Sequence, residues 1–92
     1  MEGFDDEEWA EMQEMYINHT SKELEKIKSE LTLESIDSIR NFGHNIKGSG
    51  GMYGFDEVTK IGLLIETAAK ADDLESIKSN LKDLENFLQS KR

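Results

Sequence analysis

Residues 36–54 read IDSIRNFGHNIKGSGGMYG, and their pattern determines how the rest of the chain is arranged. Small and apolar residues recur here at steps of three and four, the spacing of one helix face: Ile36, Ile39, Gly43, Ile46, Gly50 and Tyr53. Each glycine costs about 1 kcal/mol of helix propensity relative to alanine. We therefore expect Gly43 and Gly50 to let a neighbouring helix approach closely. Gly54 is expected to end this helix in the left-handed conformation, with Phe55 packing back on the helix end.

The segment before this helix predicts one long amphipathic helix over residues 5–29. Its apolar face is formed by Trp9, Met12, Tyr16, Thr20, Leu24, Ile27 and Leu31. Thr20-Ser21-Lys22-Glu23 has the Thr-x-x-Glu form of a capping box, so a break near Asn18 is an alternative. We favour a continuous helix.

Two further helices are predicted after residue 54. The third uses Asp56 as its N-cap and buries Val58, Ile61, Ile65 and Ala68, with Leu64 at the margin of this stripe. Asp72 and Asp73 are expected to end the third helix and to cap the fourth. The inner face of the fourth helix is formed by Leu74, Ile77, Leu81, Leu84 and Leu88. Four amphipathic helices with short connections predict an all-α, up-and-down antiparallel four-helix bundle, with residues 1–92 forming a single domain.

Composition narrows the classes of function. The 92-residue chain has no cysteine and no proline, and its 20 acidic and 11 basic residues give a net charge of −9. This charge repels a nucleic-acid backbone, so we expect no nucleic-acid partner. The acidic run Asp5 to Glu8 lacks the spacing of a calcium loop and favours a helix N-terminus. Apolar runs are short and no cationic, apolar leader opens the chain, so we expect a cytoplasmic protein that neither spans nor binds a membrane. A monomer is the default expectation for its oligomeric state.

His44 lies on the outer face of its predicted helix. Each helical residue advances about 100° around the axis, which turns His44 away from the side that carries Ile39 and Ile46. Gly48, one turn later, leaves space beside the imidazole, and Lys47 supplies a cation. A histidine is substantially neutral at pH 7, so one ring nitrogen can act as a nucleophile. Because no paired acid and base, nucleotide loop or metal-ligand cluster accompanies it, these residues predict an acceptor without its own catalytic turnover.

The run His44-Asn45-Ile46-Lys47-Gly48-Ser49, followed by Tyr53-Gly54, resembles the signature of histidine-containing phosphotransfer (HPt) domains. That signature reads His, any residue, hydrophobic, Lys, Gly and small, and later an aliphatic or aromatic residue and glycine. The resemblance implies a helical bundle in which His44 accepts the phosphoryl group. It also implies that Lys47 is the cation beside that group and Gly48 the residue that gives clearance. Gly43 and the pair Gly50-Gly51 depart from the family, because they make this helix unusually rich in glycine.

The resemblance also implies the partners. HPt domains exchange phosphoryl groups reversibly with the aspartate of response-regulator receiver domains, which supply the magnesium, so no cofactor or metal is expected on this chain. A hybrid histidine kinase is a further candidate partner. We expect receivers to dock over the second and third helices around His44, with Arg40, Asn41, Gly51, Met52 and Leu63 as candidate contacts.

Two other functions remain as alternatives. The first is a helical interaction module that binds a receiver or another helix without carrying phosphate. The second is an acyl- or peptidyl-carrier protein modified at Ser38, because Asp37-Ser38-Ile39 resembles the Asp-Ser-Leu triplet of such carriers. Ser38, however, falls within a helical period rather than after a long loop. His19, among Asn18, Thr20 and Ser21, is interpreted as an ordinary surface histidine.

Overall fold

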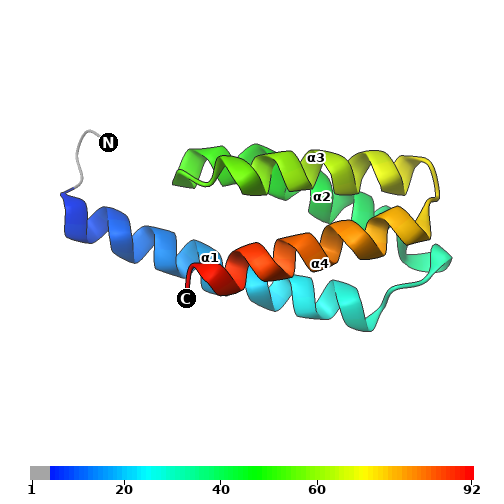
Figure 1. The fold of residues 1–92 in the computed structure, drawn as a ribbon, viewed down its shortest axis with the longest axis horizontal. Helices are drawn as coiled ribbons and strands as arrows, with labels where there is room; N and C mark the ends of the chain where they lie inside the picture. The colour runs from blue at the N-terminus through cyan, green and yellow to red at the C-terminus, as the bar shows by residue number, and fades with distance from the viewer. Residues whose placement is uncertain (1–4) are drawn as a thin grey trace.

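The computed structural model describes residues 5–92, which form four α-helices and two single-turn 3₁₀-helices. In chain order these are α1 (Asp6–Ser29), η1 (Leu33–Ser35), α2 (Ile36–Gly50), η2 (Gly51–Tyr53), α3 (Asp56–Lys70) and α4 (Leu74–Ser90). Successive α-helices run in opposite directions along the long axis (Figure 1). The prediction of an all-α bundle with up-and-down order is therefore confirmed.

Helix α1 is continuous, as predicted, and shows no break near Asn18. It begins where the Asp5 side chain accepts a hydrogen bond from the Glu8 amide (2.7 Å), and three further acids in its first turn favour the positive end of the helix dipole. Thr20 is buried within the helix instead of capping a second one. The first turns of α1 project beyond the end of α4 (Figure 1).

The connection between α2 and α3 corrects one prediction. Gly54 adopts the left-handed conformation (φ 84°) as predicted, but it ends η2, the 3₁₀ turn that follows α2, whereas α2 itself ends at Gly50. The Phe55 amide bonds the Gly50 carbonyl (2.8 Å). Asp56, however, is not the N-cap of α3: Phe55 holds that position, and Asp56 is the first helical residue. After the left-handed turn at Gly54, α3 therefore begins one residue earlier than the sequence pattern suggested. At the other end of α3, Asp73 caps α4 as predicted.

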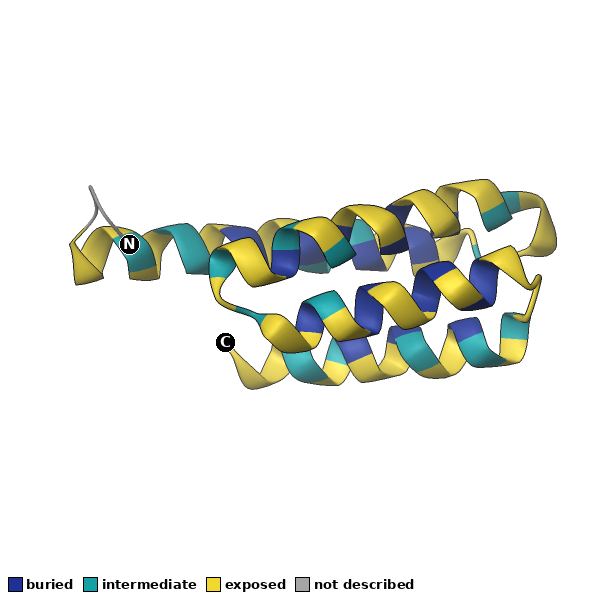
Figure 2. Ribbon diagram, turned by 90° about the horizontal axis from the view of Figure 1, so that it is seen from above, coloured by how far each residue is buried: buried dark blue, intermediate teal, exposed yellow. Residues whose placement is uncertain are grey.

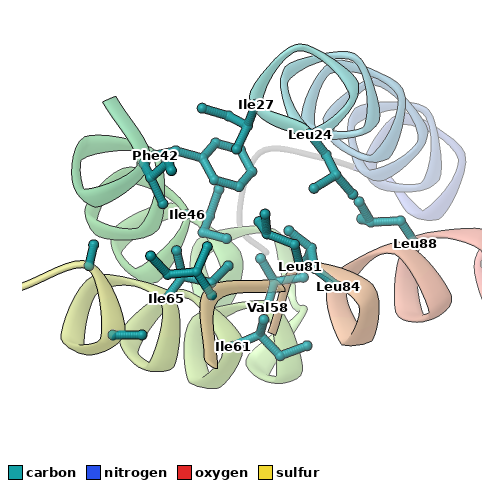
Figure 3. Packing of buried hydrophobic residues seen from close by; sticks show 14 of the residues in the cluster. Leu24, Ile27, Phe42, Ile46, Val58, Ile61, Ile65, Leu81, Leu84 and Leu88 are labelled. Atoms are coloured by element: carbon teal, nitrogen blue, oxygen red, sulfur yellow. The ribbon is translucent and has the colours of Figure 1, made fainter. Parts of the chain in front are cut away.

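The core lies along the inward faces of all four helices (Figure 2). Figure 3 shows how side chains from the four helices interlock, and its labelled members are Leu24, Ile27, Phe42, Ile46, Val58, Ile61, Ile65, Leu81, Leu84 and Leu88. Most of these follow the predicted stripes. Phe42, which the sequence pattern did not single out, is also buried (4% exposed). Trp9, which was predicted on the apolar face of α1, is only half-buried.

Candidate functional site

Glycines bring α2 and α3 into backbone contact, and this contact creates the site. A Cβ atom at Gly43 would lie 2.7 Å from the Glu66 amide nitrogen, and one at Gly50 would lie 2.7 Å from the Thr59 amide nitrogen. On the facing helix, a Cβ at Gly62 would lie 2.6 Å from the Lys47 amide nitrogen. Real Cβ atoms essentially never approach so closely, so a side chain at any of these three positions would force α2 and α3 apart. The predicted role of Gly43 and Gly50 in close packing is confirmed.

This close approach lets an acid on α3 reach two residues of α2. His44 Nδ1 lies 2.9 Å from Glu66 Oε2, and Lys47 Nζ donates a hydrogen bond to Glu66 Oε1 (2.7 Å). The Glu66 side chain is 8% exposed, whereas the His44 side chain is 64% exposed. One buried carboxylate therefore holds the cation with one oxygen and orients the exposed imidazole with the other.

The protonation of this cluster follows from its hydrogen bonds. The Lys47 hydrogen bond is the main reason that the pKa of Glu66 lies below its ordinary value of 4.5, and the bond to His44 lowers it further. Glu66 is therefore a carboxylate at neutral pH and only accepts hydrogen bonds. The proton it shares with His44 must then be on Nδ1, which in a neutral ring leaves the lone pair on Nε2.

Gly48 keeps the surroundings of His44 open. It lies one turn after His44 on the same side of α2, and a Cβ at this position would meet no atom within 4 Å. The neighbouring motif residue Ser49 points elsewhere, because its hydroxyl hydrogen-bonds Tyr16 of α1 (2.7 Å). The arrangement thus offers an exposed, oriented imidazole with room for an incoming group.

The candidate docking residues do not form one cluster. Arg40 is exposed one turn before His44 and pairs with Asp37 (3.4 Å), while Asn41 lines a hollow between α1 and α2. Gly51 and Met52 belong to η2. From the rise per residue of a helix, they lie roughly 11 Å beyond His44 along the axis of α2. The Gly51 amide is bonded to the Thr59 hydroxyl (2.8 Å), which gives that glycine a structural role.

Leu63 is the candidate docking residue that the structure brings to the His44 side of α3. It is 50% exposed and lies one turn before Glu66, so it shares the face of α3 that meets His44. The neighbouring Leu64, with a similar exposure of 52%, instead lines a hollow between α3 and α4. These two leucines form a matched pair for testing which face binds a partner.

Glu66 is the member of the His44 cluster that the sequence interpretation missed. It follows Gly62 by four residues and precedes Ala69 by three, and both of these neighbours are buried. An acid within the buried face of α3 is the signal that marks Glu66 as unusual. Its partners lie on another helix, so the α3 pattern alone did not reveal them.

The other polar candidates lie away from this cluster. His19 is exposed on α1 and pairs through Nε2 with Glu23 (2.9 Å), and Ser38 is exposed in the first turn of α2. Within residues 5–92, no group of three or more histidine, cysteine, aspartate or glutamate side chains is arranged to hold a metal ion. The same part of the chain contains no helix that is long and apolar enough to span a bilayer.

Comparison with known families identifies the bundle. A family model described as the Hpt domain matches residues 11–91, which is nearly the whole chain. The chain belongs to the Hpt domain family. Hpt domains carry phosphoryl groups on histidine in phosphorelays and work with receiver domains, so this chain has a histidine phosphotransfer role. Neither the curated proteins nor the solved structures give a significant match.

Proposed function

We propose that His44 is the residue of this Hpt domain that carries the phosphoryl group, which it exchanges with the aspartate of a response-regulator receiver domain. The hydrogen bond from Nδ1 to Glu66 is the observation that supports this most directly, because it leaves Nε2 as the nucleophilic nitrogen of an exposed ring. In the chain's other histidine, His19, Nε2 is itself the atom that pairs with a carboxylate.

The transfer follows from this geometry. The Nε2 lone pair attacks the phosphorus of the receiver's aspartyl phosphate, an N–P bond forms, the P–O bond to the aspartate breaks, and the aspartate leaves as a carboxylate. Attack places positive charge on the imidazole ring, and the Glu66 carboxylate beside Nδ1 stabilises that charge. The reverse steps return the phosphoryl group. The domain is a carrier, and we assign the magnesium that assists transfer to the receiver.

Lys47 has two functions in this proposal. Its ammonium group keeps Glu66 ionised and aligned, and its side chain remains one-third exposed at the edge of the site. After transfer, the phosphoryl group on His44 competes with Glu66 for this cation. Lys47 thus balances negative charge both before and after transfer, and Gly48 leaves room for the receiver.

The central experiment incubates the protein with a panel of phosphorylated receiver domains and detects acid-labile, base-stable phosphate. We expect phosphate on the wild type and on His19→Gln, and none on His44→Gln. Circular dichroism of each variant checks that the bundle is folded. Undiminished labelling of His44→Gln would refute His44 as the acceptor.

Glu66 acts as a positioning residue, which a second experiment tests. Since a misplaced reacting group costs up to about a hundredfold in rate, we expect Glu66→Gln to slow transfer between about tenfold and a hundredfold. Glu85→Gln is the matched control, because it removes an equally ion-paired glutamate on α4. Nitrogen chemical shifts of His44 should show the Nδ1-protonated tautomer in the wild type and in Glu85→Gln, with a changed tautomer ratio in Glu66→Gln. The same ratio in all three proteins would remove the positioning role.

A third experiment tests the docking face. Gly48→Glu and Leu63→Glu should each block transfer without changing the circular dichroism, because both add a charged side chain on the acceptor side. Leu64→Glu, on the face toward α4, should transfer at the wild-type rate. If Leu64→Glu is the impaired leucine variant, the receiver docks on a different face of α3.

A further inference from the structure

The overhanging part of α1 exposes a surface that the phosphotransfer site does not use. Helix α1 has 24 residues, whereas α2 and α3 have 15 each and α4 has 17. Its first turns extend beyond α4 (Figure 1) and are held to the body by contacts with η2. Gln13 Nε2 donates to the Tyr53 carbonyl (2.9 Å), and the Trp9 and Tyr53 rings lie parallel with centroids 6.4 Å apart.

A mainly apolar hollow lies where this overhang meets η2. It has a volume of about 360 Å³ and is lined by Met12, Met15, Tyr16, His19 and Tyr53, and we call it the overhang groove. Stacking of Tyr16 on Tyr53 (centroids 4.5 Å apart) gives it a rigid floor. Met15 at its edge is 70% exposed. Flexible thioethers over a fixed aromatic floor suit the apolar side chains of a bound helix.

The rim of the overhang groove is negatively charged. Residues 5–18 contain six acids and no base. Glu8 and Glu11 precede Met12 and Met15 by four residues each, so they lie one turn away from these methionines on the same side of α1. At its other end, Glu23 pairs with His19. An occupant with apolar side chains in the groove and lysine or arginine at its margins complements both the floor and the rim.

The same charges argue against a second copy of this chain. A symmetric contact through the groove would place the acidic rims of the two copies together, which costs free energy. The groove also lies on a different side of α2 from the acceptor. Ser49, which bonds Tyr16 beneath the groove, is five residues after His44 and therefore about 140° around the helix.

We propose that the overhang groove binds a cationic amphipathic helix of a partner protein, on a surface separate from the phosphoryl-accepting face.

The test uses a synthetic 18-residue peptide designed to place leucine on one helical face and lysine on the other. We expect a saturable complex, monitored by calorimetry and by the fluorescence of Trp9, the only tryptophan of the chain. Met15→Asn should weaken binding about fivefold through the lost apolar contact. Glu8→Gln with Glu11→Gln should weaken it about threefold through the lost rim charges.

Matched controls separate this groove from general attraction to an acidic protein. Glu75→Gln with Asp83→Asn removes the same charge from the exposed surface of α4 and should bind the peptide within about twofold of the wild type, because distant surface charges are screened. Equal weakening by the two double variants would overturn the proposal. So would equal binding of a scrambled peptide with the same composition.

Two further measurements distinguish other occupants. The wild type should sediment as a monomer, and a dimer that Met15→Asn dissociates would assign the groove to a second copy and overturn the proposal. Met15→Asn should also accept phosphoryl groups at the wild-type rate. Impaired transfer in this variant would make the groove part of the receiver-docking surface, which contradicts the proposed separation. Failure of the His44 experiments would leave the peptide result unaffected.

Discussion

The same substitution, glycine to alanine, is expected to have opposite effects at two positions of α2. At Gly48 the new methyl group meets no atom within 4 Å, so Gly48→Ala gains about 1 kcal/mol of helix propensity. At Gly43 the methyl carbon would lie 2.7 Å from the Glu66 amide nitrogen, 2.9 Å from Ile65 Cγ2 and 3.0 Å from the Gly62 carbonyl oxygen. Two of these three atoms belong to the backbone and cannot rotate away.

Relieving these contacts requires α2 and α3 to separate. Overpacking a tight core costs about 1–3 kcal/mol, and we take the upper value because backbone must move. Subtracting the gain in helix propensity leaves Gly43→Ala less stable than the wild type by about 2 kcal/mol. In a domain of this size the melting temperature changes by about 4–8 °C per kcal/mol. Gly48→Ala should therefore melt about 4–8 °C higher than the wild type, and Gly43→Ala about 8–16 °C lower.

Urea and thermal unfolding followed by circular dichroism measure both variants under identical conditions. Gly43→Ala should also shift the His44 ring signals, since separating the helices moves Glu66 away from Nδ1. A Gly43→Ala protein as stable as the wild type would show that α2 and α3 do not depend on glycine for their contact. A destabilised Gly48→Ala protein would refute the open surroundings assigned to His44.

Three further predictions concern stability. The pKa values of Glu66 and Glu85 lie below their ordinary value of 4.5, mainly because a lysine ammonium hydrogen-bonds each of them. In acid the unfolded chain therefore binds more protons than the folded chain does, so the free energy of unfolding should fall as the pH drops from about 5 through the folded-state pKa values of the two carboxyl groups. A urea midpoint that stays constant from pH 6 to pH 3 would contradict this prediction. Tyr16→Phe and Ser49→Ala each remove one partner of a side-chain hydrogen bond and should each cost about 1 kcal/mol, with the double variant costing less than the sum. Thr59→Val should cost about 1–3 kcal/mol in urea unfolding, because the Thr59 hydroxyl bonds two backbone groups near the end of α2, and unchanged stability would rule out that contribution.

The sequence predicted the helices because each is specified locally. Apolar spacing located the buried faces, and the ends at Gly54 and Asp73 lie where the residue types suggested, as does the acidic start of α1. The failure at Asp56 is a matter of one residue. Asp56 and Phe55 are both compatible with the start of α3, and the position of the left-handed turn before them, not the preference of aspartate, decides which residue caps the helix.

The cluster of His44, Lys47 and Gly48 could be located from the sequence for the same reason, since these residues lie within five positions of one helix. Glu66 was not, because it lies 22 residues from His44, and their contact depends on the register between α2 and α3. The helix patterns do not fix that register. It follows from the way the glycines of α2 face Gly62 of α3, which becomes visible only when both helices are placed.

The distribution of charge reconciles a strongly acidic protein with the phosphoryl-carrying role proposed for His44. The α2–α3 hairpin, residues 36–70, contains equal numbers of acidic and basic residues: Asp37, Asp56, Glu57 and Glu66 against Arg40, Lys47, Lys60 and Lys70. The net charge of −9 therefore arises entirely outside the hairpin. At physiological ionic strength, interactions between exposed charges are screened beyond about 8 Å, so the local charge decides what can approach His44. In the proposed transfer, a phosphoryl dianion approaching His44 therefore meets a neutral hairpin, with Lys47 paired to Glu66, and not the repulsion that the total charge would suggest.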